Sequence, residues 1–184
     1  MDRRIIKTKK AIRVAFSSLI KEKNISEITV SELSKKADID RRTFYLHYSA
    51  VSDIIREIED EAAFTLNEEM SARKFEITDF FECLNKILLS NFEYYQCITS
   101  ESGYYSFQIE CKKILKNAIT RSFLDKSGMR KKLFDYYAEY VTSGIMALYI
   151  KWANSQERCS AEELSKIAAI AVNDSWKLIT GEKT

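Results

Sequence analysis

The chain has 184 residues, of which 46% are hydrophobic and 30% charged, and its formal net charge is +2 at pH 7. This length is sufficient for one large or two small domains with a hydrophobic core. Proline is absent, only four glycines occur, and apolar residues recur at helical spacing without a sustained period of two, so the sequence predicts an all-α fold. No apolar run approaches the roughly 20 residues of a membrane span, and the N-terminus is too charged for a signal peptide, so we expect a cytoplasmic protein.

Positive charge is concentrated at the N-terminal end. Residues 1–48 hold twelve Lys and Arg against six Asp and Glu, a net of +6, whereas residues 49–184 hold seventeen against twenty-one, a net of −4. Basic residues lead into a first helix predicted from about Thr8 to Lys23: Arg3, Arg4, Lys7, Lys9, Lys10 and Arg13. A basic segment of this kind is typical of a DNA-binding domain, and the alternative is a solvated tail.

Two short helices around a tight turn are predicted next. Thr29 and Glu32 have the spacing of a capping box, which predicts a helix from Val30. Asp38 follows where the chain must turn, and Asp tolerates the left-handed backbone conformation better than most residues. Asp40 is a good N-cap for a second helix, which we expect at 41–48.

The second of these helices carries side chains that suit DNA. Phe44 and Tyr48 are four residues apart and are expected to face inward, which leaves Arg41, Arg42, Thr43, Tyr45 and His47 on the outside. A helix-turn-helix places the N-terminal residues of its second helix against base edges in the major groove. Arg is the commonest reader of guanine there.

These residues resemble the DNA-binding domain of TetR-type (tetracycline-repressor-like) transcriptional regulators. Members of that family carry a pattern like A-A-x-x-L-F and then T-V-x-x-I-A-x-x-A-G-V-S-x-x-T-x-Y-x-H-F. The corresponding residues here are A-I-R-V-A-F-S-S-L-I at 11–20 and T-V-S-E-L-S-K-K-A-D-I-D-R-R-T-F-Y-L-H-Y at 29–48. The resemblance implies a DNA-binding head at 1–50 and a helical effector-sensing and dimerisation body at 51–184, with about nine helices in total.

The chain departs from the family pattern at three positions. Asp38 replaces the usual turn glycine, and Arg42 replaces a residue that is often small. Val51 stands where the family often has a phosphate-binding Lys, so one backbone contact is expected to be missing, and Ser49 or Ser52 would replace only part of it.

A set of DNA contacts follows from the motif and the resemblance. We expect Arg41 and Arg42 to read bases, Thr43 to contact a base methyl or a phosphate, and the other members to bind phosphates of a palindromic double-stranded operator. The full set is Lys7, Lys10, Thr29, Ser31, Arg41, Arg42, Thr43, Tyr45 and His47.

The middle of the chain is rich in aromatic residues. A long helix is expected from Val51, a break at 71–76, a helix from about Thr78, an irregular stretch at 91–105 and another helix from Phe107. Aromatic walls with a few hydroxyls suit a small apolar or aromatic effector, and the alternative is that these residues simply fill the core. The candidate pocket residues are Phe81, Phe92, Tyr95, Tyr104, Tyr105, Phe107 and Phe123.

The C-terminal third predicts two long helices. One apolar stripe runs from Phe134 to Trp152, a second face of the same helix carries Tyr136, Tyr140, Gly144 and Ala147, and the final helix is apolar nearly all round. Because one protomer supplies too few neighbours for such helices, we expect a homodimer through a four-helix bundle, against the alternative of an intramolecular core. The predicted interface is Val141, Gly144, Ile145, Leu148, Trp152, Ile167, Ile170 and Ala171.

Catalytic and metal-binding functions find little support. The cysteines lack C-x-x-C spacing and the chain has one His, so we expect no metal site, no cofactor and no enzymatic activity. The cysteines are expected to be reduced and packed in the core, with redox sensing as the alternative. We therefore predict a one-component operator-binding repressor released by an unidentified small molecule. The alternatives are an activator or partner-recruiting regulator of the same fold, and a sensor that has lost DNA binding.

Overall fold

The computed structural model describes residues 3–72, 76–100 and 106–180, and within these ranges every regular element is helical. The nine α-helices of the described ranges confirm the predicted all-α class. Their bounds are α1 Arg3–Leu19, α2 Val30–Lys36, α3 Arg41–Tyr45, α4 Val51–Ala72, α5 Ile77–Ser90, α6 Phe92–Ser100, α7 Ser106–Phe123, α8 Lys131–Asn154 and α9 Ala161–Thr180, with one 3-10 turn at Ile25–Glu27. None of the described helices is long and apolar enough to cross a membrane.

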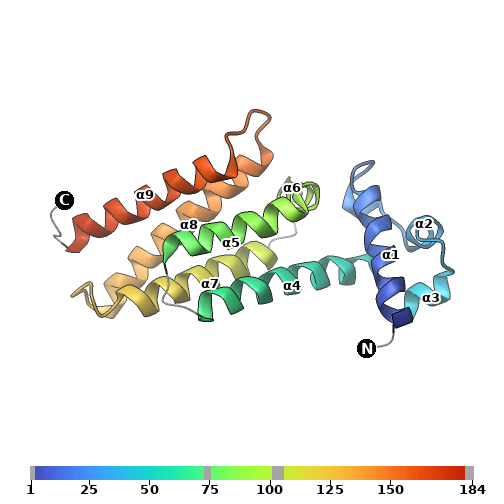
Figure 1. Ribbon diagram of the computed structural model, residues 1–184, viewed down its shortest axis with the longest axis horizontal. Helices are drawn as coiled ribbons and strands as arrows, with labels where there is room; N and C mark the ends of the chain where they lie inside the picture. The colour runs from blue at the N-terminus through green and yellow to red at the C-terminus, as the bar shows by residue number, and fades with distance from the viewer. Residues whose placement is uncertain (1–2, 73–75, 101–105, 181–184) are drawn as a thin grey trace.

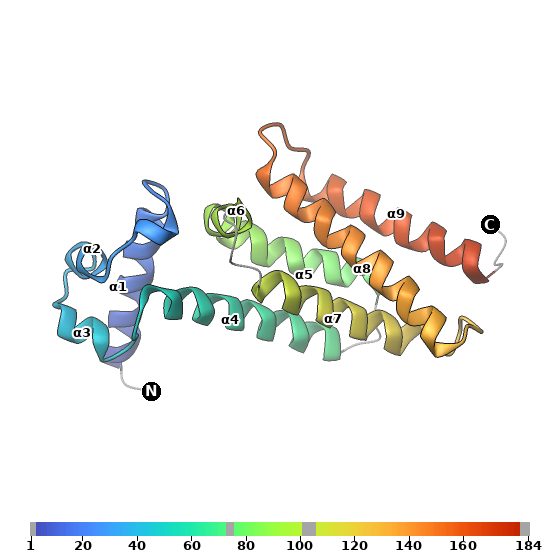
Figure 2. The ribbon, with the colours of Figure 1, turned by 180° about the vertical axis from the view of Figure 1, so that it is seen from behind.

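The helices form two groups joined by α4. Helices α1–α3, which we call the head, gather at one end of the molecule (Figure 1). Helix α4 leaves the head and runs along α7, while α8 and α9 lie side by side on the opposite side of α5 and α7 (Figure 2). We call α4–α9 the body. The division into two domains at residue 50 stays a prediction.

The predicted first helix and the predicted irregular stretch after Asn91 differ from the structure. The first helix runs over Arg3–Leu19 rather than from Thr8 to Lys23, because the chain turns after Leu19 and buries Ile20 and Ile25 beneath the head. The stretch after Asn91 was expected to be irregular, yet Phe92–Ser100 is helical. Its aromatic residues are the reason, since they form the side of α6 that packs on its neighbours.

Aromatic side chains of α5, α6 and α8 build the core of the body. Phe81 stacks on Tyr149 with ring centroids 6.0 Å apart, and Phe92 meets Trp152 edge to face at 5.4 Å. The Tyr149 hydroxyl donates to Oδ1 of Asn85 over 3.1 Å, which satisfies the polar end of this buried ring.

Head and body also meet through an aromatic contact. Phe16 of α1 and Tyr94 of α6 are both fully buried, and their rings pack edge to face with centroids 6.2 Å apart. The Tyr94 hydroxyl donates to the backbone oxygen of Ile55 in α4 over 3.4 Å. Three helices, α1, α4 and α6, are therefore held at one junction.

A network of charged side chains secures α1 to α4 beside this junction. Nζ of Lys9 lies 2.6 Å and Nη2 of Arg13 lies 2.7 Å from the carboxylate of Glu57, and Nη2 of Arg13 also lies 2.7 Å from Glu61. The Tyr48 hydroxyl donates to Glu57 over 3.2 Å. Partial burial of Glu57 acts to raise its pKa, but the hydrogen bond from Lys9 and the positive charge of Arg13 outweigh it, so the pKa is lowered.

Glu57→Gln should destabilise the protein at neutral pH. Hydrogen bonds to charged groups contribute about 1.5–3 kcal/mol, so we expect the free energy of unfolding to fall by roughly this amount at pH 7. Because the folded-state pKa of Glu57 is lowered, its stabilisation is fully present above the unfolded value of about 4.3 and is lost as pH falls through the folded value. Urea unfolding at pH 7 and pH 3 measures both effects.

The control for this variant is Glu68→Gln, which removes an exposed carboxylate further along α4. The control should leave the unfolding free energy unchanged at both pH values. Equal stability of Glu57→Gln and Glu68→Gln at pH 7 would contradict the role assigned to the network.

Candidate nucleic-acid interface

The start of α2 is fixed by the capping box that the sequence predicted. The Glu32 backbone N–H donates to Oγ1 of Thr29 over 3.3 Å, and the Glu32 carboxylate accepts from the Thr29 N–H over 3.0 Å. Lys23 lies 2.5 Å from the same carboxylate. The hydrogen bond from Lys23, with those from Thr29, lowers the pKa of Glu32 to about 2. Glu32 is therefore ionised at neutral pH and holds the N-terminus of α2 in place.

The turn between α2 and α3 has the predicted left-handed residue. Asp38 has a φ of 53°, and it is the non-glycine residue with positive φ in the described part of the chain. Asp40 then caps α3, since its Oδ1 accepts from the Thr43 N–H over 2.7 Å, and this backbone hydrogen bond lowers the pKa of Asp40. The helix-turn-helix geometry is thereby set by local side chains.

Helix α3 is shorter than expected. It covers Arg41–Tyr45, whereas the sequence predicted a helix to Tyr48. The Tyr48 N–H still donates to the Phe44 oxygen over 3.0 Å, so the chain makes one more turn before α4. Both aromatic anchors are buried as predicted, Phe44 completely and Tyr48 to 4% exposure. The Tyr48 hydroxyl then donates to Glu57 of α4 over 3.2 Å, so the segment after α3 is tied to the linking helix.

The predicted base-reading side chains lie on the outer face of the motif. Arg41 and Arg42 are exposed, and Tyr45 has 58% of its surface accessible. Nη2 of Arg41 donates to Oγ of Ser31 over 2.6 Å, which ties the start of α3 to the start of α2. Thr29 and Ser31 are exposed, while Thr43 and His47 are half-buried. The arrangement presents two guanidinium groups beside hydroxyl groups.

Four basic residues of α1, from Lys7 to Arg13, divide into two sets. Lys9 and Arg13 are bound to carboxylates of α4, so they serve the junction with the body. Lys7 and Lys10 are exposed and make no ion pair with a residue that the structure describes. They line an open cavity of about 480 Å³ together with Lys36 and Asp38, which places them beside the helix-turn-helix. Lys7 and Lys10, unlike Lys9 and Arg13, are therefore available for phosphate.

The predicted effector residues that the structure describes do not gather around one cavity. Phe81 and Phe92 pack in the core of the body, Tyr95 packs edge to face on Tyr94 at 5.0 Å, and Phe123 lies 4.8 Å from the ring of Trp176. Tyr104, Tyr105 and the side chain of Phe107 lie outside the described residues. The described members thus contribute mainly to packing, although Tyr95 also lines a cleft between head and body and Phe81 lines a groove between α5 and α9.

The predicted dimer residues separate into buried and exposed groups. Val141, Ile145 and Trp152 are buried within the protomer and Leu148 is half-buried, because that stripe of α8 packs on the body. Gly144, Ile167, Ile170 and Ala171 are exposed. The second face of α8 is also exposed, with 63% of Tyr136 and 76% of Tyr140 accessible. The final helix, expected to be buried on every side, leaves Ile167 and Ile170 each 59% exposed in the protomer.

Comparison with known proteins agrees with this geometry. The sequence profile of a TetR-type transcriptional regulator C-terminal region matches residues 76–174, more than half of the chain. The chain belongs to the TetR family of transcriptional regulators. Regulators of the TetR family bind DNA operators and act as dimers, and the family and fold are not those of enzymes.

Individual TetR-family and related proteins are distant in sequence. An uncharacterized HTH-type transcriptional regulator of Bacillus subtilis (strain 168), YxbF, is 25% identical over 157 residues, which is 82% of this chain and 40% of that protein. The chain therefore spans 40% of the length of this relative. A TetR transcriptional regulator from Streptococcus agalactiae 2603V superposes with a TM-score of 0.69 at 23% identity, covering 93% of this chain and 96% of that one. The dihydroxyacetone kinase operon activator DhaS also gives a TM-score of 0.69, at 19% identity, covering 94% of this chain and 98% of its own.

Replacing Asp38, which stands where TetR-family proteins usually have glycine, tests the cost of its backbone conformation. Asp38→Gly should raise the free energy of unfolding by up to about 1 kcal/mol, since glycine adopts positive φ without a steric penalty. Asp38→Val should lower it by about 1–2 kcal/mol. Asp38→Asn is the matched control, because it removes the charge and still tolerates this conformation. A higher free energy of unfolding for Asp38→Val than for Asp38→Gly would contradict the left-handed backbone conformation assigned to this position.

Proposed function

We propose that the protein is a one-component transcriptional regulator that binds a palindromic operator as a homodimer and changes its operator affinity when a small molecule binds. The observation that carries the proposal is the exposed pair Arg41 and Arg42 at the start of α3, on a helix-turn-helix fixed by caps at Thr29 and Asp40. Arg side chains at the N-terminal end of a recognition helix have the reach and donor geometry to read guanine in the major groove.

The remaining contacts of the proposal go to the DNA backbone. Lys7 and Lys10 supply positive charge beside the motif, and Thr29, Ser31, Tyr45 and His47 supply polar hydrogen atoms. Phosphate contacts hold the protein in register and provide affinity, but they carry little sequence information. Arg41 also donates a hydrogen bond to Ser31, which in this proposal holds its guanidinium group beside the start of α2 before DNA binds.

The proposed dimer interface combines the exposed faces of α8 and α9. Tyr136, Tyr140 and Gly144 follow one another at four-residue spacing on α8, and Ile167 and Ile170 lie on the neighbouring helix. Exposed apolar residues in such number mark an interaction surface. A Cβ atom added at Gly144 would meet nothing within 4 Å in the protomer, so packing inside one chain does not require the glycine. In this proposal, the glycine is needed for the close approach of a helix from the partner protomer.

The direction of regulation is the finer part of the proposal. We propose repression that is relieved by the effector, through a movement of α4 that changes the separation of the two α3 helices. A homodimeric helix-turn-helix protein reads half-sites about 34–36 Å apart, or a multiple of this distance, so a small rigid-body shift lowers affinity. A protein of the same fold, DhaS, is an operon activator. Activation of transcription is therefore the second candidate. The tests of DNA binding below do not depend on whether the protein represses or activates. Operator binding also implies action in the cytoplasm, as the sequence suggested.

Substitutions in α3 and α1 should change operator binding in different ways. Arg42→Ala should cost about 1–3 kcal/mol per half-site and relax the sequence preference at one base pair. Lys10→Ala should weaken binding to all sequences alike and reduce the salt dependence by about one counterion. Fluorescence anisotropy on DNA from upstream of the gene, at several salt concentrations, measures both.

The control for the DNA titration is Lys132→Ala, which removes an exposed cation at the start of α8, far from the head. This variant should bind as the unmodified protein does. Unchanged affinity and specificity in both Arg41→Ala and Arg42→Ala would exclude α3 as the base-reading element.

Gly144→Leu should prevent dimer formation without unfolding the protomer. The added side chain has open space in the protomer, and replacing a helical glycine favours the helix by up to about 1 kcal/mol, so any loss of assembly reports on the partner. Analytical ultracentrifugation should show a monomer that has lost operator binding. Asn117→Leu, at an exposed position of α7, is the control and should remain dimeric. A monomeric unmodified protein at micromolar concentration would contradict the interface.

A further inference from the structure

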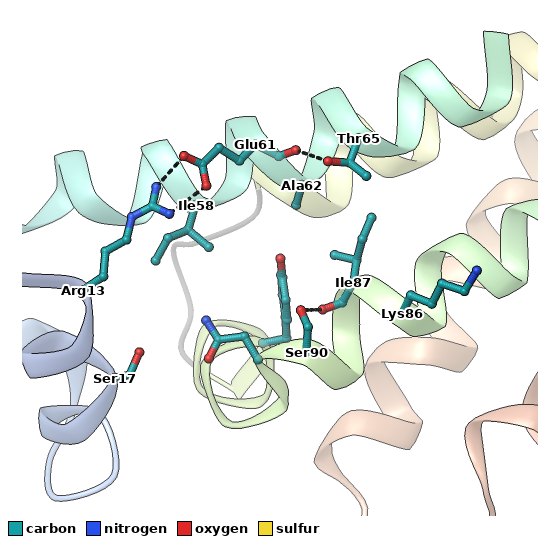
Figure 3. Close-up of a pocket in the computed structure, with 11 residues that line it drawn as sticks. Arg13, Ser17, Ile58, Glu61, Ala62, Thr65, Lys86, Ile87 and Ser90 are labelled. Carbon is teal, nitrogen blue, oxygen red and sulfur yellow. Dashed lines mark hydrogen bonds and ion pairs between the residues drawn. The ribbon is translucent and has the colours of Figure 1, made fainter. Parts of the chain in front are cut away.

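An open cleft separates the head from the body beside their junction. It has a volume of about 590 Å³ and lies between α1, α4, α5 and α6. Figure 3 shows Arg13 and Ser17 on the α1 side, Glu61 on α4, and Lys86 and Ser90 on α5. Ligand pockets for small molecules have volumes of about 300–1,000 Å³. The cleft therefore has the size of a site for one small molecule, with walls from both groups of helices.

The lining offers an apolar floor and polar edges. Ile58 and Ala62 of α4 face Ile87 of α5 across the cleft (Figure 3). Polar groups surround this floor, among them Ser90, whose hydroxyl donates to the Ile87 oxygen over 2.7 Å and keeps its own oxygen as an acceptor. The Asn91 amide, in the break between α5 and α6, also lines the cleft. Such a surface suits a molecule that has both an apolar and a polar part.

The charged residues that line the cleft indicate which kind of molecule it binds. Arg13 is already paired with Glu57 and Glu61, so its charge is compensated. Lys86 lines both the cleft and the groove between α5 and α9, and it makes no ion pair with any residue in the described ranges. The charged groups of the lining are thus two cations and one carboxylate, with the excess positive charge at Lys86. An anionic group is the complement of this excess.

We propose that the cleft binds a small organic anion, a carboxylate on an apolar body, with the carboxylate at Lys86, the apolar body on Ile58, Ala62 and Ile87, and Ser17 of α1 against its other side. In this proposal, which rests on the proposed regulatory function, that anion is the effector. The site is formed by the head and the body together.

The position of the cleft gives a direct route to the recognition helix. A ligand that contacts α1 on one side and α5 on the other binds with different affinity to different head positions, and such a difference is what an effector needs to shift an equilibrium. The cleft wall already contains the Arg13–Glu61 ion pair, and Lys21 after α1 pairs with Glu93 of α6 at 2.7 Å. Changes in the cleft therefore act on the contacts that set the angle of the head.

The groove between α5 and α9 is the competing site. It is larger, at about 750 Å³, and more apolar, with Phe81, Leu89 and Ile170 in its lining. All its walls belong to the body, so a ligand there has no contact with the head. Ile170 also belongs to the proposed dimer face. The two sites can be separated experimentally because Leu89 faces the groove while its neighbour Ser90 faces the cleft.

Fluorescent probes test the cleft without DNA. Dansylglycine carries a carboxylate on an aromatic body, and dansylamide is its neutral counterpart. The full-length protein should bind dansylglycine saturably, one per protomer, and dansylamide at least about tenfold more weakly, since a charge-assisted hydrogen bond is lost. Lys86→Gln should remove the preference for dansylglycine, which tests the role of this charge, and the variants below separate the cleft from the groove, since Lys86 lines both. No saturable binding, or equal affinity for the two probes, would overturn the proposal.

Matched variants then locate the probe. Ser90→Trp, which fills the cleft, should weaken dansylglycine binding at least about tenfold, and Leu89→Trp, which fills the groove, should leave it unchanged. Ser17→Trp fills the cleft from α1 and serves if Ser90→Trp does not fold. Loss of binding in Leu89→Trp, with binding retained in the cleft variants, would assign the site to the groove and overturn the proposal.

The link to regulation is measured last, on operator DNA. Saturating dansylglycine should change operator affinity by roughly 5- to 150-fold, and operator DNA should change dansylglycine affinity by the same factor. If the protein binds dansylglycine but does not bind operator DNA, the proposed function is contradicted and the cleft stands as a binding site. Normal operator binding without probe binding would overturn the cleft and leave the proposed function standing.

Discussion

The carboxylate of Glu57 in α4 is the central contact among those that hold the head at its angle to the body. Two cations of α1 and the hydroxyl of Tyr48 converge on it, so the first helix, the end of the helix-turn-helix and the linking helix share a single anchor. The buried aromatic contact between Phe16 of α1 and Tyr94 of α6 packs beside this network. Because charged hydrogen bonds are directional and aromatic packing is close, the pair allows a small set of head positions rather than a continuum.

The same anchor decides which side chains remain for DNA. A basic N-terminal segment appears as one electrostatic feature in the sequence, yet Lys9 and Arg13 are used internally and Lys7 and Lys10 are not. Arg13 and its ion-pair partner Glu61 also line the cleft between head and body. Positioning of the head, the proposed contact with phosphate and the proposed ligand site thus draw on neighbouring residues of one helix. A change in the charge or contacts of these α1 residues therefore affects the head position, the proposed phosphate contacts and the proposed ligand site together.

The features predicted from sequence were those set by local chemistry. The capping box at Thr29, the left-handed Asp38 and the Asp40 cap each depend on residues within four positions, so spacing alone was sufficient. Features set by distant partners were missed. Helix α3 ends at Tyr45 and the segment after it is tied to α4 through Tyr48 and Glu57, and no local signal near Tyr45 indicates this.

The faces of α8 show the same limit on prediction in another form. Both of its faces are apolar at helical spacing, so periodicity could not tell which one the body buries, and the interface prediction took Val141, Ile145 and Trp152 from the buried one. The aromatic residues of the middle helices were likewise ambiguous between cavity and core. Tyr94, fully buried at the junction, was one of many aromatics in the sequence, and only its contact with Phe16 reveals its position.

The central claim is that two copies of α3 read two half-sites in a spacing fixed by the body. Selection of bound sequences from random double-stranded DNA by the full-length protein, followed by sequencing, tests it most directly. The account predicts an enriched inverted repeat whose half-site centres lie about one helical turn of DNA apart, or a multiple of this distance, with guanine at the positions read by Arg41 or Arg42. No enriched sequence, or a single half-site without its inverted copy, would contradict it.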